Sequence, residues 1–135
     1  MTHEISVQED CALNYANEVI FPKWNNNIVL ELISSPNGEL SFSEIAQRIP
    51  EISPRMLSMR LKHLVDYKVL DIIPNENKPK KVRYELTKNG NELAHVLNVI
   101  RNWSLKYGNC QNQLCQDNLC AHGIAINKML ELFTL

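Results

Sequence analysis

Residues 53–67 read SPRMLSMRLKHLVDY, and this stretch decides the fold that the rest of the chain can adopt. Its apolar residues recur at helical spacing and form one stripe: Leu57, Leu61, Leu64 and Val65. Ser53 suits the N-cap of a helix, and Pro54 suits the first helical position. We therefore predict an amphipathic helix that buries this leucine stripe.

The opposite face of that helix is polar and cationic. At about 100° per residue, Arg55, Met59 and Lys62 point away from the stripe, and His63 lies at its flank. Residues 42–49 form a shorter helical pattern, which residues 50–52 interrupt with a proline. A short helix, a tight turn and a longer capped helix predict a helix-turn-helix, whose second helix enters the DNA major groove.

Length and composition indicate one folded domain. The chain has 135 residues, of which 44% are hydrophobic and 21% charged, so it can bury a core. No apolar run approaches the roughly 18 residues that a membrane span needs. The first residues lack the profile of a signal peptide. We expect a soluble, cytoplasmic protein with no membrane partner.

Charge is distributed unevenly along the chain. The net charge of −1 argues, taken globally, against a nucleic-acid binder. Residues 55–88, however, hold nine Lys and Arg against four Asp and Glu, whereas residues 1–54 hold two against eight. The positive charge is concentrated on the predicted reading helix and on the segment C-terminal to it, as phosphate contacts require.

A β-hairpin is predicted after this helix. Residues 69–73 are short and β-branched, residues 82–86 alternate apolar and polar, and the polar loop 74–81 joins them. In a DNA-binding protein such a hairpin is a wing. Lys78, Lys80 and Lys81 at its tip would reach phosphate or the minor groove.

The remaining elements are predicted to be mainly helical. We expect a short helix over residues 11–17, a firmer one over 24–35, a short strand at 40–42 and a final helix at 121–135. A long helix should begin near Gly90 and end at Tyr107. Its apolar stripe is longer than a small domain can cover, which indicates a second subunit. The predicted interface of this two-fold homodimer contains Leu13, Ile100, Trp103, Tyr107, Leu130 and Phe133.

Several blocks in order resemble the HxlR-type family of winged-helix transcription regulators, within the MarR-like superfamily. The matching segments are Lys23-Trp24 with Leu30-Glu31-Leu32, Phe42-Ser43-Glu44-Ile45, residues 52–64, and residues 82–90, VRYELTKNG. The resemblance covers about residues 11–107. It implies a dimeric DNA-binding regulator without catalytic activity, whose N- and C-terminal helices build the dimer. The sequence also lacks a glycine-rich phosphate loop, a zinc-protease motif and a nucleophile elbow, so we expect no enzyme.

The chain departs from this family pattern in three places. Met59 stands where the family often carries a polar residue. A methionine cannot hydrogen-bond a base edge there, but it can make an apolar contact with a thymine methyl group. Asn25, Asn26 and Asn27 make the start of their helix unusually polar. The cysteine-rich segment from Cys110 to Cys120 is outside the pattern.

The cysteines admit more than one interpretation. Cys11 lies where members of this family that sense oxidants or electrophiles carry a reactive cysteine, but neighbouring Glu9 and Asp10 oppose a thiolate. The alternative is a small buried hydrophobe in a helix at the dimer interface. Cys110, Cys115, Cys120 and His122 could close a tetrahedral zinc site, although their spacing is unusual. Free thiols or a disulfide are the alternatives. No other cofactor is expected.

The sequence thus predicts a mainly α-helical fold with a small β-hairpin wing. Residues 1–108 form the winged helix-turn-helix with its dimerisation helices, and 109–135 add a cysteine-rich loop and a helix. The predicted function is sequence-specific regulation of transcription as a homodimer on double-stranded DNA, as a repressor that could respond to oxidants. The alternative is a winged-helix protein-interaction module without specific DNA binding. The predicted DNA-contacting residues are Ser53, Arg55, Met56, Ser58, Met59, Arg60, Lys62, Lys78, Lys80 and Lys81.

Overall fold

The helices and strands follow one another in the predicted order in a computed structural model that describes residues 11–78, 81–108, 124 and 128. The elements are α2 (Leu13–Val19), α3 (Asn25–Ser34), β1 (Glu39–Ser41), α4 (Phe42–Arg48), α5 (Pro54–Asp66), β2 (Leu70–Ile73), β3 (Arg83–Leu86) and α6 (Lys88–Tyr107). The predicted helix at 121–135 lies almost wholly outside the described residues. Within the described part of the chain, no helix is long and apolar enough to span a membrane.

Helix α5 has the amphipathic character that residues 53–67 predict. The Ser53 hydroxyl accepts a hydrogen bond from the backbone N–H of Met56 at 3.1 Å, and Pro54 occupies the first turn. Leu57, Leu61 and Leu64 are at most 1% exposed, so each contributes about 1.5–3 kcal/mol of hydrophobic stabilisation. They pack in one core with residues of α3, α4, β2 and α6: Ile28, Leu32, Ile45, Leu70 and Leu93.

Helix α4 and the turn after it complete the predicted helix-turn-helix. The Ser41 hydroxyl caps α4 by accepting a hydrogen bond from the N–H of Glu44 at 3.2 Å. Ile45 is fully buried, and Ile49 and Ile52 are buried in the turn between α4 and α5. The turn is therefore fixed by its own apolar residues as well as by Pro50.

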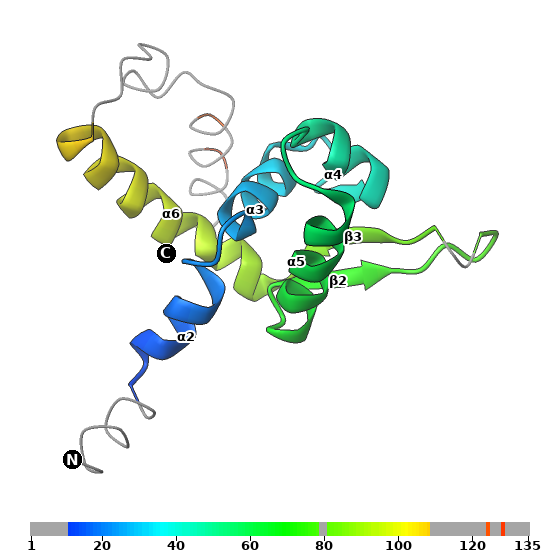
Figure 1. Cartoon of the computed structure of the whole chain (residues 1–135), viewed down its shortest axis with the longest axis horizontal. Helices are drawn as coiled ribbons and strands as arrows, with labels where there is room; N and C mark the ends of the chain where they lie inside the picture. The colour runs from blue at the N-terminus through cyan, green and yellow to red at the C-terminus, as the bar shows by residue number, and fades with distance from the viewer. Residues whose placement is uncertain (1–10, 79–80, 109–123, 125–127, 129–135) are drawn as a thin grey trace.

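The three strands form one antiparallel sheet in the order β1-β3-β2. Tyr84 of β3 pairs with Leu40 on one side and with Ile72 on the other. The predicted hairpin is confirmed, and it extends away from the helices as a wing (Figure 1). The strand predicted at 40–42 lies one residue earlier, because the Ser41 cap makes Phe42 the first residue of α4.

Asparagine side chains join α2 to α3. Asn25 is fully buried, and its amide donates to the carbonyl oxygen of Val19 at 2.9 Å, while Asn26 donates to that of Ile20 at 3.0 Å. These carbonyls belong to the end of α2, where a helix lacks internal donors. Helix α2 ends at Val19, two residues beyond the predicted range 11–17 and before Pro22, and Val19 and Ile20 are buried. The polar start of α3 therefore has a structural role that we did not predict.

Gly90 allows α6 to pack closely against the sheet. Thr87 caps α6 by accepting a hydrogen bond from the N–H of Gly90 at 3.1 Å, and its hydroxyl also donates to the carbonyl of Lys68. A Cβ at Gly90 would meet the carbonyl oxygen of Val69 and the side chain of Leu86 inside normal contact distance. The start of α6 is thus held against the residues that lead into β2.

We predict that Gly90→Ala destabilises the fold although alanine is the better helix former. In a helix interior, alanine stabilises the helix by about 1 kcal/mol relative to glycine. Here the added methyl group would force the Val69 backbone to move, and such overpacking costs about 1–3 kcal/mol. Urea denaturation should show a lower free energy of unfolding for Gly90→Ala. The control is Asn102→Ala, at an exposed position of the same helix, which should be at least as stable as the unmodified protein because nothing there is overpacked. An unchanged or higher stability of Gly90→Ala would contradict this packing.

Candidate DNA interface

The outward face of α5 presents four of the predicted contact residues to solvent. Arg55, Ser58, Met59 and Lys62 are exposed, and Met59 keeps 53% of its surface accessible. Their position follows from the burial of the leucine stripe on the other side of the same helix. A helix held in this way offers short polar, apolar and cationic groups that can contact base edges and phosphates.

Three further predicted contact residues on α5 are engaged in the structure of the helix itself. The hydroxyl of Ser53 serves as the helix cap. Met56 is half-buried and packs against the core. Arg60 is also half-buried, and its Nε is buried with no hydrogen-bond partner. Arg60 lies one helical turn from both Leu57 and Leu64, at the edge of the buried stripe. The aliphatic stem of Arg60 therefore faces the core, and only the end of its side chain can reach outward.

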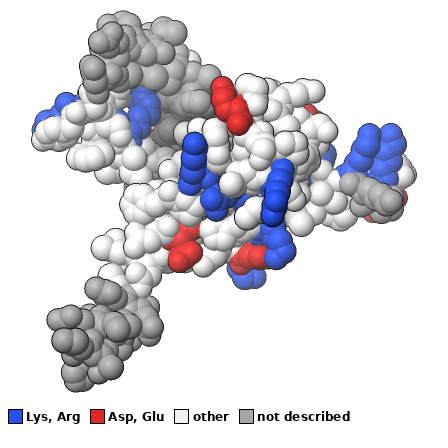
Figure 2. Space-filling model, viewed as in Figure 1, with Lys and Arg blue, Asp and Glu red and all other residues white. Residues whose placement is uncertain are grey.

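The wing adds a second basic group of residues. Lys78 and Lys81 are exposed, and the N–H of Lys81 donates to the carbonyl of Lys78 at 2.8 Å. The Asn75 side chain accepts hydrogen bonds from the N–H groups of Asn77 and Lys78, which folds the loop into a turn. Lys80 lies outside the described residues. Figure 2 shows Lys and Arg at the wing tip and over the body of the molecule on one face.

Not all the basic residues in segment 55–88 are available to a polyanion. Arg83 bridges two carboxylates, with Nε 2.9 Å from Glu39 and Nη1 2.8 Å from Glu44. The hydrogen bond from Arg83 holds the pKa of the Glu44 carboxyl below its ordinary value, and the bond to Glu44 raises the pKa of Arg83. Lys62 also forms an exposed pair with Asp66 at 3.2 Å. The free positive charge is therefore smaller than the sequence count suggests.

The ion pairs of Arg83 have a positional role that the sequence did not reveal. Glu39 belongs to β1, Glu44 to α4 and Arg83 to the base of the wing. Arg83 also donates to the backbone carbonyl of Glu39 at 3.2 Å. Arg83 is 44 residues from Glu39 and 39 residues from Glu44 in the chain, and the strand register brings it to both of them. The three residues join the wing to the first helix of the helix-turn-helix.

The C-terminal end of α5 is held by a polar and aromatic group of residues from three helices. His63 lies 3.4 Å from the amide nitrogen of Asn25, and its ring meets that of Tyr67 edge-on at 4.8 Å. The Tyr15 hydroxyl donates to the carbonyl of Tyr67 at 3.2 Å and accepts a hydrogen bond from Asn89 at 2.6 Å. The reading helix is therefore connected to α2 and α6.

Helices α2 and α6 carry the exposed apolar surface that we predicted for a dimer. Leu13, Trp103 and Tyr107 are each about two-thirds exposed. Phe21 and Val99, which we did not name, are equally exposed. Ile100, also predicted for the dimer, is half-buried and packs against the core of its own subunit. Leu130 and Phe133 lie outside the described residues.

The cysteine predictions are only partly covered by the structure. Cys11 is exposed and unpaired in the single subunit. Cys110, Cys115, Cys120 and His122 lie outside the described residues. Among residues 11–78 and 81–108, no group of His, Cys, Asp or Glu could hold a metal ion.

Comparison with known proteins agrees with this arrangement. A regulator of the HTH type from Methanothermobacter thermautotrophicus is 33% identical over 101 residues, which cover 75% of each chain. The HTH-type transcriptional regulator YodB from Bacillus subtilis is 30% identical over 95 residues, or 70% of this chain and 82% of that one.

Solved structures extend the likeness to three dimensions. The reduced form of YodB superposes with a TM-score of 0.64 at 29% identity, covering 73% of this chain and 95% of that one. The regulator ytcD superposes with a TM-score of 0.66 at 29% identity, covering 74% and 99%. The family model described as HxlR-like helix-turn-helix matches residues 19–112, from the end of α2 to beyond α6. The chain belongs to the HxlR-like helix-turn-helix family.

Proposed function

We propose that this protein is a transcription regulator that binds specific DNA sites as a homodimer, with α5 in the major groove and the wing on the adjacent backbone. One observation carries the proposal: the exposed face of α5 holds Arg55, Met59 and Lys62 and adjoins a basic wing. The family and the names of its relatives support a regulator over a protein-interaction module without DNA binding. In this role the protein acts on DNA in the cytoplasm and needs no catalytic group.

Each part of the surface has a distinct task in this proposal. Arg55, Ser58, Met59 and Lys62 contact base edges and nearby phosphates. Ser53, Met56 and Arg60 mainly hold the helix in place, and the end of Arg60 reaches the DNA backbone. Phosphates are contacted by Lys78, Lys80 and Lys81. On binding DNA, Lys62 leaves its ion pair with Asp66 and contacts a phosphate instead. Phosphate contacts set affinity, whereas contacts on α5 set the preferred sequence.

The dimer of this proposal uses the exposed surface of α2 and α6. One reading helix covers few base pairs, whereas two helices about 34 Å apart fit successive major grooves. Leu13, Val99, Trp103 and Tyr107 supply an apolar face on one side of the winged helix. We assign residues 109–135, with Leu130 and Phe133, to the same interface. A stable interface of this kind buries more than about 1,000 Å².

Cys11 is the candidate for a redox response. It is exposed, and solved structures of YodB include reduced, diamide-treated and quinone-bound forms. Zinc binding by Cys110, Cys115, Cys120 and His122 is a separate proposal, with a disulfide or free thiols as its alternatives. Both proposals concern the signal that the regulator receives and leave its DNA contacts unchanged.

Selection of bound sites from random duplex DNA tests the proposed function. We expect an enriched, two-fold symmetric site with half-sites about 10 base pairs apart. Met59→Ala should relax preference at one position in each half-site, at a cost of about 1 kcal/mol, which corresponds to the loss of an apolar contact with one thymine methyl group. The control is Gln47→Ala, an exposed residue on α4 that is not assigned to base contact. Equal weakening on all sequences would show that Met59 only positions the protein, and no enrichment would reject the function.

The salt dependence of DNA affinity tests the phosphate contacts proposed for the wing. Lys78→Ala/Lys81→Ala removes two proposed phosphate contacts, so affinity for all duplexes should fall together. The slope of log affinity against log salt should decrease in magnitude by about 1–2 units. Lys23→Ala is the control, because this exposed lysine lies over Trp24 and belongs neither to the wing nor to the proposed dimer interface. A slope that stays the same would remove both lysines from the interface.

The dimer is tested by placing a charge in the proposed seam. Trp103→Glu should give monomers in sedimentation at micromolar concentration and abolish specific binding, while circular dichroism stays unchanged. The reason is that burying an unpaired carboxylate at an interface costs several kcal/mol. Asn102→Glu, on a different face of the same helix, should remain dimeric. A Trp103→Glu protein that remains dimeric would place the interface elsewhere.

A further inference from the structure

The ion pairs of Arg83 lie at the point where the wing leaves the sheet. Arg83 is the first residue of β3, and it pairs with Ser41, the last residue of β1, and with Ile73, the last residue of β2. Beyond this row the hairpin continues as residues 74–82 without β1 beside it, and it extends away from the helices (Figure 1). The direction in which the wing projects is therefore decided at this row.

Arg83 is engaged at this row by four hydrogen bonds. Its Nε donates to a carboxylate oxygen of Glu39 at 2.9 Å, and its Nη1 donates to one of Glu44 at 2.8 Å. Its Nη2 donates to the backbone carbonyl of Glu39 at 3.2 Å and to the other carboxylate oxygen of Glu44 at 3.4 Å. A guanidinium group has five N–H donors, so little of Arg83 remains for a DNA phosphate. Arg83 can therefore affect DNA binding mainly through the position of the wing.

We propose that Arg83 is a positioning residue for DNA binding: by holding both carboxylates it aims the wing, so that Lys78 and Lys81 reach phosphates. This inference rests on the proposed function and deepens it. Lys78 lies five residues from Arg83, at most roughly 16 Å of extended chain, so a turn of about 20° at Arg83 moves the tip by about 5 Å. A displacement of that size exceeds the length of a hydrogen bond and removes a phosphate contact.

The surroundings of Arg83 are acidic, which separates its position from its charge. Glu39, Glu85 and Asp71 lie directly opposite one another on the three strands, and therefore on one face of the sheet. Arg83 lies two residues from Glu85 and shares this face. Acidic groups repel a phosphate backbone, so charge alone predicts that removing any two of them strengthens DNA binding. Positioning by Arg83 predicts the opposite result when the acids removed are its own partners.

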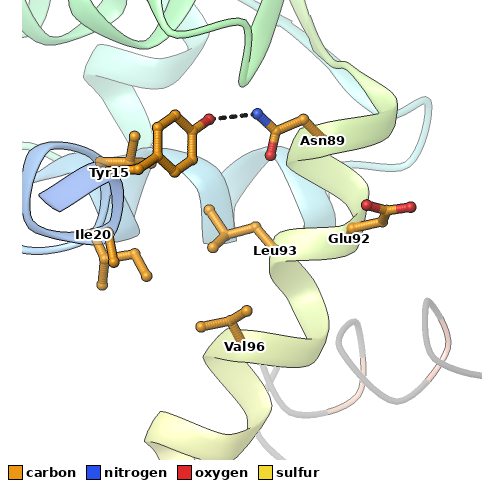
Figure 3. Close-up of a pocket in the computed structure, with 8 residues that line it drawn as sticks. Tyr15, Ile20, Asn89, Glu92, Leu93 and Val96 are labelled. Carbon is orange, nitrogen blue, oxygen red and sulfur yellow. Dashed lines mark hydrogen bonds between the residues drawn. The ribbon is translucent and has the colours of Figure 1, made fainter. Parts of the chain in front are cut away.

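The polar contact at the other end of the reading helix does not include the wing. There the Asn89 amide donates to the Tyr15 hydroxyl and joins α6 to α2 (Figure 3). Arg83, in contrast, joins a strand of the wing to β1 and α4. We therefore assign the direction of the wing to Arg83.

The test compares two variants that each remove two negative charges. The bridge variant, Glu39→Ala/Glu44→Ala, removes both partners of Arg83. The sheet variant, Asp71→Ala/Glu85→Ala, removes two exposed acids that form none of the ion pairs among the described residues. The bridge variant should bind the selected DNA site about tenfold more weakly although it is more positive, because charge-assisted phosphate contacts are lost. The sheet variant should bind at least as tightly as the unmodified protein.

The salt dependence of binding is a readout that a purely structural role would not change. In the bridge variant the slope of log affinity against log salt should decrease in magnitude by about 1–2 units, as in the wing variant, Lys78→Ala/Lys81→Ala. Combining the bridge and wing variants should add little further loss, because both remove the same contacts. Arg83→Lys keeps the charge without the planar fork, so it should lose part of the affinity and of the slope. Circular dichroism checks folding, and Arg83→Lys takes the place of the bridge variant where that variant does not fold.

Three results would overturn the positioning role. Tighter DNA binding by the bridge variant would show that Glu39 and Glu44 act only through their charge. A lower free energy of unfolding in urea, with affinity and salt slope unchanged, would show that Arg83 only supports the fold. Full addition of the losses of the bridge and wing variants would show that Arg83 acts independently of the wing tip. Each of these rejects the positioning role alone, whereas an unmodified protein that enriches no DNA site rejects the proposed function as well.

Discussion

The burial of Leu57, Leu61 and Leu64 is the constraint on which the rest of the structure depends. Together these side chains contribute several kcal/mol, comparable with the whole net stability of a small domain. Rotating α5 by a quarter turn would expose part of this stripe and bury polar residues in its place. The helix therefore has one stable orientation, and that orientation decides that Arg55 and Met59 face solvent. The chemistry of the outer face is free to vary without cost to the core.

Polar contacts fix the positions of the wing and of the helix ends, which the burial of the leucine stripe does not determine. Hydrophobic burial is non-directional, so it fixes which face is inside better than it fixes where the wing and the helix ends lie. Arg83 sets the wing against α4 through two carboxylates, and this contact weakens at acid pH because protonation of Glu44 removes its charge. Tyr15 and Asn25 contact the C-terminal end of α5 at Tyr67 and His63. The three contacts surround the proposed DNA-binding surface.

The periodic elements were predictable from the sequence, and the contacts between them were not. Leucine spacing, the Ser53 cap and the alternation in VRYEL are local signals, so α5 and the wing could be predicted together with most of their outer residues. The charge of Arg83 is visible in the sequence, but its partners are about forty residues away and depend on strand register, so its ion pairs cannot be predicted locally. The charge of Arg60 predicts a DNA contact, whereas its angular position beside Leu57 places it at the edge of the buried stripe. The polar run at Asn25 was visible, but its partner carbonyls could only come from the fold.

The connection between the proposed seam and the reading helix follows from how α6 is held. Its N-terminal end is fixed by Thr87 and Gly90 against the residues after α5, whereas its C-terminal half is exposed. Twenty residues of helix extend about 30 Å, so a tilt of about 2° at the fixed end moves the other end by about 1 Å. In a two-fold dimer both subunits would tilt, and the separation of the reading helices would change by a comparable amount. Small rearrangements near Asn89 and Tyr15 are therefore well placed to alter the fit to two successive major grooves.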